Sequence, residues 1–148
     1  MYFKQFLLVF IVGGVFSACD NDSIKEKDLP SVVKNGFKAR FEEAVGANWE
    51  RKNNDYEVEF KIDRKDYAAL INEAGMITMV KYEIAATELP QAINTLLIGQ
   101  YQGFKLDEIE KIEKDNQIYY QVELDGKKDK HLVFSAEGQE ANEFAYWN

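Results

Sequence analysis

Few side chains in this sequence are equipped for catalysis. The chain holds one histidine, His131, and one cysteine, Cys19. A Ser-His-Asp arrangement would need Ser31 or Ser135, and neither lies in the glycine-framed elbow that exposes a nucleophile. Carboxylates are so abundant, with 26 Asp and Glu residues, that a pair suited to acid–base work carries no information. We therefore expect no catalytic residues and predict that the protein is not an enzyme.

The sequence also lacks the residues that metal binding or nucleic-acid binding would need. No histidine–cysteine cluster has zinc spacing, and the acidic turns at 20–22 and 53–55 do not continue into the spaced oxygen ligands of a calcium loop. The formal net charge of −8 repels phosphate backbones, and no stripe of Lys and Arg offsets it. We expect no metal site, no cofactor and no nucleic-acid partner. The partner that remains is an unidentified protein or peptide.

The amino terminus has the pattern of an export signal. Lys4 precedes an apolar run over residues 6–16. This run is too short to span about 30 Å of hydrocarbon, but its length suits the core of a signal peptide. Residues 16–19, Phe-Ser-Ala-Cys, resemble a lipobox, in which cleavage exposes a cysteine that is then lipidated.

These signals predict how the chain is processed and where it resides. We expect a signal peptide over 1–18, lipidation of Cys19, and a flexible polar tether over 19–28. The alternative is an ordinary signal peptide cut near Ala18. A lipid on Cys19 would be the only contact with the membrane, and it predicts an outer-membrane lipoprotein on the periplasmic side or at the cell surface.

The elements that position any site are organised around two similar strands. Apolar and acidic residues alternate over 56–60, Tyr-Glu-Val-Glu-Phe, and nearly the same pattern returns over 120–124. A period of two predicts strands with one buried face. Leu-Pro also occurs twice, at 29–30 and 89–90, each time before an amphipathic helix. Repetition at coherent spacing indicates a duplicated unit.

The duplication predicts one domain over 29–148, with repeats at 29–85 and 87–148. Each repeat has one helix followed by four antiparallel strands. In the first repeat, an apolar stripe predicts a helix that ends at Gly46, and Trp49 opens a short strand. Joined edge to edge, the repeats predict an α+β fold with about eight antiparallel strands in one sheet and two helices on one face. The opposite face is expected to be open to water.

This pattern resembles a known family. The features that carry the resemblance are Leu29, Pro30, Trp49, 56–60 and Gly75 in the first repeat, and Leu89, Pro90, 120–124 and Gly138 in the second. They are similar to the PepSY-like, beta-lactamase-inhibitor-like domains of lipoproteins from Bacteroidetes-type bacteria. The resemblance implies a duplicated helix-plus-four-strand fold and brings no catalytic residues. It does not imply inhibition of a beta-lactamase, because one fold hosts many functions.

The open sheet face is the predicted binding surface. The residues expected to contact a partner are Glu57, Glu59, Ile77, Met79, Glu123, Phe144 and Tyr146. Strand parity places the three glutamates on the face away from the helices. The same parity turns Ile77, Met79, Phe144 and Tyr146 outward and Trp147 inward. The alternatives are that the parity is reversed, or that these residues pack at the seam between the repeats.

Together, these observations predict a secreted, lipid-anchored binding module of the bacterial envelope without enzymatic activity. It would bind a protein or peptide through the open sheet face, and inhibition is one use of such binding. The alternative function is a small-ligand or calcium-binding envelope module.

Overall fold

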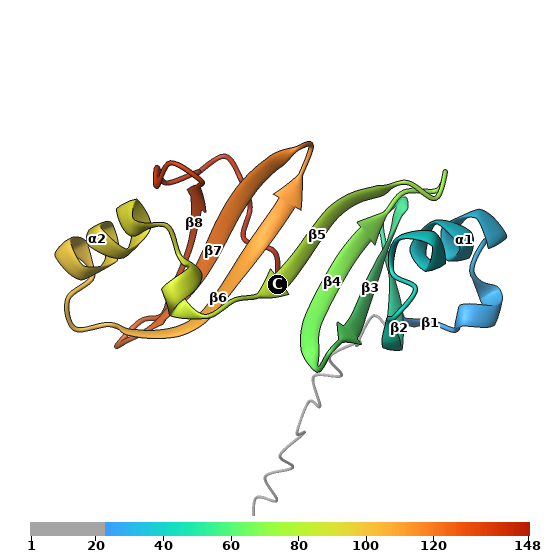
Figure 1. Cartoon of the computed structure of the whole chain (residues 1–148), viewed down its shortest axis with the longest axis horizontal. Helices are drawn as coiled ribbons and strands as arrows, with labels where there is room; N and C mark the ends of the chain where they lie inside the picture. The colour runs from blue at the N-terminus through green and yellow to red at the C-terminus, as the bar shows by residue number, and fades with distance from the viewer. Residues whose placement is uncertain (1–22) are drawn as a thin grey trace, which may run out of the picture.

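The computed structural model describes residues 23–148, so the predictions for the signal peptide and for Cys19 lie outside the described residues. Eight strands form a single sheet in chain order, and every neighbouring pair is antiparallel. The strands are β1 (Ser23–Ile24), β2 (Val45–Lys52), β3 (Asp55–Ile62), β4 (Lys65–Ile71), β5 (Ile77–Glu83), β6 (Lys105–Lys114), β7 (Gln117–Asp125) and β8 (Lys130–Ser135). Figure 1 shows the sheet running through the whole molecule.

Two ten-residue helices, α1 (Ser31–Arg40) and α2 (Gln91–Gln100), lie toward the two ends of the sheet (Figure 1). Each follows a short 3-10 helix, η1 (Glu26–Asp28) or η2 (Ala86–Glu88), and a Leu-Pro pair. Proline suits this position because its missing N–H would be unpaired there in any residue. No helix within residues 23–148 is both long enough and apolar enough to cross a membrane.

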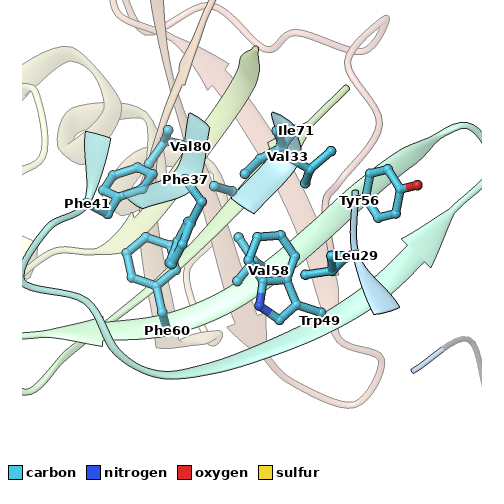
Figure 2. Packing of buried hydrophobic residues seen from close by; sticks show 11 residues of the cluster. Leu29, Val33, Phe37, Phe41, Trp49, Tyr56, Val58, Phe60, Ile71 and Val80 are labelled. Atoms are coloured by element: carbon cyan, nitrogen blue, oxygen red, sulfur yellow. The ribbon is translucent and has the colours of Figure 1, made fainter. Parts of the chain in front are cut away.

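The first core packs α1 against strands β2 to β5. Figure 2 shows this cluster, in which Val33 and Phe37 of α1 reach down to Val58 and Phe60 on β3. Phe37 meets Phe60 edge to face, with ring centroids 5.0 Å apart, and meets Trp49 in the same manner at 5.1 Å. The alternation at 56–60 is thereby explained, since every second side chain of β3 enters this core.

The second core repeats this arrangement under α2. Its buried residues include Ile93 and Leu97 of α2, Val122 of β7 and Phe134 of β8. The register joins Tyr82 to Lys111, Lys111 to Tyr120, and Tyr120 to Phe134, so both helices cover the same side of the sheet. Tyr82 packs against both clusters and links them. We call this side the helix face.

The other side of the sheet, which we call the acidic face, carries Glu57, Glu59, Lys81, Glu110, Gln121 and Glu123. The predicted α+β architecture, with eight antiparallel strands, two helices on one face and a duplicated unit, is confirmed. The strands are shared unequally between the repeats. The first repeat contributes β2 to β5 and the second only β6 to β8, so the eighth strand is β1.

The expectation of a flexible tether over 19–28 is wrong for its second half. Ser23 and Ile24 form β1, which pairs with Glu50 and Trp49 of β2, and η1 follows directly. Ile24 packs against the first core. The polar composition concealed this strand, because a single apolar residue at the sheet edge is enough to hold it.

The first helix is also shorter than its apolar stripe predicts. It ends at Arg40, and Val45 opens β2 with 63% of its surface exposed instead of lying in the helix core. Gly46 is not a helix stop. It lies with φ of 69° in a stretch where the register between β2 and β3 shifts, and glycine adopts this backbone conformation without strain.

Candidate functional site

The most informative feature of the acidic face is the polypeptide that lies on it. Residues 141–148, which we call the C-terminal segment, follow a single bridge between Glu140 and Phe134. The Ala141 amide still donates to the Val133 carbonyl of β8, at 2.8 Å. Beyond this point the segment leaves the sheet edge and crosses the acidic face, and the chain ends over the middle of the sheet (Figure 1).

Gln121 holds the backbone of this segment by both of its polar atoms. Its Nε2 donates to the Trp147 carbonyl at 2.9 Å, while the Trp147 amide donates back to Gln121 Oε1 at 3.1 Å. Nε2 also donates to the Glu110 carboxylate. Gln121 is only 1% exposed, so these are buried hydrogen bonds whose loss leaves polar atoms unpaired. A side-chain amide that bonds to both the N–H and the C=O of one residue is suited to binding extended polypeptide.

Lys81 is the cation at the centre of this arrangement. Its Nζ lies 3.2 Å from a Glu110 carboxylate oxygen and donates to the Trp147 carbonyl at 2.9 Å. It also lies 5.3 Å from the centre of the Trp147 ring, within range of a cation–π interaction. Both Lys81 and Glu110 are largely buried, which removes most of the solvent screening that weakens surface ion pairs.

Three aromatic side chains of the C-terminal segment rest on side chains of the acidic face. Phe144 lies on Tyr119 of β7, with ring centroids 4.6 Å apart, and the Lys114 ammonium lies 5.0 Å from its centre. Tyr146 lies on His131 of β8, also at 4.6 Å. Together with Trp147 on Lys81, these contacts fix the position of the segment along the face.

Burial raises the pKa of several acidic groups here. The pKa of the Glu57 carboxyl is raised by burial, and contact with Trp147 and the charge of Lys52 oppose the shift only in part. The pKa of Glu108 is raised by burial and then by the neighbouring charge of Glu110. The pKa of the Tyr146 hydroxyl is likewise raised, by burial first and by nearby carboxylates next. The Tyr146 hydroxyl therefore stays protonated and neutral.

The three predicted glutamates lie on the acidic face but in different environments. Glu59 is exposed, and Glu123 is half-buried with His131 Nε2 3.4 Å from its carboxylate. Glu57 is only 6% exposed, so the expectation that it is open to a partner is wrong. Strand parity correctly gave its side of the sheet. It could not show that Trp147 lies close to it on that side.

Ile77 and Met79 do not share a face, although both were expected to point outward. Ile77 packs against the first core, while Met79 pairs with Leu70 on the acidic side. The register shifts between Leu70 and Ile71, which inserts one residue and returns Ile77 to the helix face. Both residues line an open groove of about 950 Å³ where β5 diverges from the β6–β7 hairpin.

The expected orientations of Phe144, Tyr146 and Trp147 assumed that they continue the in-and-out alternation of a strand, and they do not. Phe144 and Tyr146 do not project freely, and Trp147 does not enter the helix-covered core. All three contact the acidic face instead. The physical reason is that the chain stops following the sheet after Glu140, so the period of two no longer determines direction.

Gln121, Lys81 and Glu110 were not among the predicted site residues. One signal in the sequence pointed to Gln121, which stands at the position in 120–124 that Glu57 holds in 56–60. A neutral amide in a strand that otherwise alternates with acids indicates a need for both a donor and an acceptor. Lys81 and Glu110 carry no comparable signal, because charged residues are common on wet strands.

His131 and Ser135, which the sequence offered for catalysis, contact neighbouring groups of the sheet and its turns. His131 lies beside Glu123 and Tyr146, and the Ser135 hydroxyl accepts a hydrogen bond from the Glu137 amide. Within residues 23–148, no group of three or more His, Cys, Asp or Glu side chains is arranged to hold a metal ion.

The fold and the site define a class of protein, a duplicated α+β domain in which one sheet face is covered by two helices and the other by the end of its own chain. The family model described as "Putative beta-lactamase-inhibitor-like, PepSY-like" matches twice, over residues 15–78 and 72–140. The chain belongs to this family. Both matches end before the C-terminal segment.

Solved structures from Bacteroides share the fold. A DUF2874 family protein from Bacteroides uniformis aligns with a TM-score of 0.70 at 17% identity, covering 76% of this chain and 86% of its own. A protein from Bacteroides eggerthii, described as a putative periplasmic protein, aligns with a TM-score of 0.71 at 14% identity, covering 77% of this chain and 86% of its own. A BLIP-like protein from Bacteroides fragilis gives 0.66 at 19% identity, covering 77% and 84%. No curated protein matches the chain.

Proposed function

We propose that the protein is an exported, lipid-anchored module of the bacterial envelope that binds a protein or peptide through the acidic face and has no catalytic activity. One observation carries this function: the acidic face already holds polypeptide backbone, with Gln121 bonded to both backbone groups of Trp147. The family description, which names an inhibitor-like fold, agrees with a role in binding.

The chemistry of the face supports a polypeptide ligand. Peptide groups need both donors and acceptors, and Gln121 with Lys81 offers both in a largely buried setting. Tyr119 and His131 supply flat surfaces for aromatic side chains. Export and anchoring rest on the apolar run at 6–16 and on Cys19, where lipidation would place the domain at a membrane surface.

Site-specific photocrosslinking tests the binding face. A photoreactive phenylalanine analogue replaces Glu59, which is exposed on the acidic face, or Ile98, which is 74% exposed on α2. In living cells that produce the chain, we expect a discrete crosslinked partner from position 59 and none from position 98. Crosslinks from position 98 alone, or from neither position, would reject the assignment of the face.

The anchor has a separate test. In cells, Cys19→Ser should abolish incorporation of a labelled fatty acid and move the chain from the membrane fraction to the soluble fraction. Ser17→Ala is the matched control, because it changes a neighbouring hydroxyl and keeps the cysteine. Continued membrane association and labelling of the Cys19 variant would contradict the anchor.

A further inference from the structure

The C-terminal segment is held in the manner of a bound ligand. Its contacts with the acidic face combine backbone pairing with Gln121, a shared cation in Lys81, and aromatic side chains resting on Tyr119 and His131. Residues 141–148 contain no helix or strand, so these contacts take the place of regular secondary structure. The helix face, in contrast, is closed by two helices and continuous apolar cores.

We propose that the C-terminal segment occupies the partner site in cis, and that the true partner is an extended peptide with an aromatic-x-aromatic-aromatic pattern that replaces it. This inference rests on the proposed function and specifies the ligand of the same face. The pattern is that of Phe144, Tyr146 and Trp147, each of which contacts a different part of the face.

The geometry explains the preference for each position. The residue at the Trp147 position is held at two points: its backbone pairs with Gln121, as that of any residue could, and its ring lies near the Lys81 ammonium, which favours an aromatic side chain. The Tyr146 ring lies on His131, and the carboxylates of Glu108, Glu110 and Glu123 near it disfavour an anionic side chain at this position. Phe144 lies between the Tyr119 ring and the Lys114 ammonium, which suits an aromatic ring over an aliphatic chain.

The segment is also attached in a way that permits exchange. The Glu140–Phe134 bridge and the Ala141 amide hold its beginning, while the remainder depends on side chains of the face. Such segments open locally without unfolding the domain. A covalently linked ligand competes at an effective concentration of roughly millimolar, so a free peptide must bind well or be concentrated to displace it.

Fluorescence anisotropy with the full chain tests the inference. The probe is a labelled synthetic peptide with the sequence of residues 141–148. The receptor is the triple-alanine variant Phe144→Ala/Tyr146→Ala/Trp147→Ala, in which the segment keeps its length and backbone but loses the three aromatic side chains that contact the face. We expect the peptide to bind this variant at least tenfold more tightly than the wild-type chain, and Gln121→Leu in the same variant to weaken binding at least tenfold. A scrambled peptide should not bind.

The outcomes separate this inference from the proposed function. Absence of peptide binding, equal binding to the wild type, or indifference to Gln121→Leu would overturn the cis-ligand inference. The crosslinking result at position 59 tests the proposed function independently of these outcomes. If mixing wild-type and triple-alanine chains yields a dimer in size-exclusion chromatography, the site belongs to the segment of a second copy and the inference is rejected.

A second measurement covers the case in which the triple-alanine variant does not fold. Hydrogen–deuterium exchange of the wild-type chain follows the Trp147 amide, which is protected by Gln121 Oε1. Excess peptide should accelerate its exchange severalfold while the β3 amides in the sheet stay protected. Unchanged exchange at millimolar peptide would contradict displacement.

Discussion

Replacement of Gly36 by alanine should destabilise the domain, although alanine is the better helix former. A Cβ atom at Gly36 would lie 2.0 Å from the carbonyl oxygen of Gly75, in the turn between β4 and β5. Gly75 has a φ of 79° and itself approaches the Val32 carbonyl, so the helix and the turn are in backbone contact. Neither backbone can rotate away, and α1 would have to lift from the sheet.

The expected size follows from two opposing terms. Glycine to alanine inside a helix is favourable by about 1 kcal/mol. Overpacking against a fixed backbone costs about 3 kcal/mol, the upper end of the usual range. Gly36→Ala should therefore lower the free energy of unfolding by about 2 kcal/mol and the Tm by about 6 °C.

Gly99 in α2 provides the matched control. A Cβ there meets nothing within 4 Å, so Gly99→Ala should keep only the propensity gain, about 0.5 kcal/mol because the residue lies near the helix end. Urea unfolding followed by circular dichroism measures both variants, with equal slopes required for comparison. Stability of Gly36→Ala equal to or above that of the wild type would refute the close contact.

Three further predictions concern the acidic face and the first core. Lys81→Met should lower the free energy of unfolding by about 2 kcal/mol, because the buried Glu110 carboxylate loses its counter-ion and keeps only its hydrogen bond from Gln121. Lys61→Met, which breaks an exposed ion pair on the same face, should lower it by under about 1 kcal/mol, and equal losses in urea unfolding would contradict this. The raised pKa of Glu57 means that its ionisation opposes folding, so the wild type loses stability as the pH rises from about 4.5 through the folded-state pKa. Glu57→Gln should thus be more stable than the wild type at pH 7, with the difference vanishing near pH 4, and a difference independent of pH would argue against the shift. Phe60→Ala should cost about 3–5 kcal/mol by thermal unfolding, whereas Val45→Ala should change stability within about 0.5 kcal/mol; a large effect at Val45 would place it back in the core.

Duplication and period two were enough to predict most of the fold. The alternation at 56–60 and 120–124 placed β3 and β7, and the turn glycines Gly75 and Gly138 both adopt positive φ, as equivalent positions should. These signals are local, because each depends on a few adjacent residues and a fixed repeat. The two cores beneath the helices follow from them directly.

Register shifts and long-range side-chain bonds could not be predicted in the same way. The register shift at Leu70 and Ile71 moves Ile77 to the opposite face, and the alternation of apolar and polar residues in the two strands does not predict this shift. The bond between Gln121 and Trp147 joins residues on a strand and on an irregular segment. It depends on a chain path that leaves the sheet, whereas pattern reasoning assumes that the path continues along it.

The unequal repeats give a physical reason for this departure. In the first repeat, the chain after the Gly75 turn becomes β5, which pairs with β4 on one side and β6 on the other. In the second repeat, the chain after the Gly138 turn has only β8 beside it, because β8 is the last strand of the sheet. A fourth strand there would pair with β8 but would itself become the edge strand, so the sheet would still have an open edge. By crossing the acidic face instead, the same stretch buries Trp147 and gives Gln121 two partners. Duplication therefore produced two equivalent stretches with different roles: one joins the repeats, and the other rests on the surface that we assign to the partner.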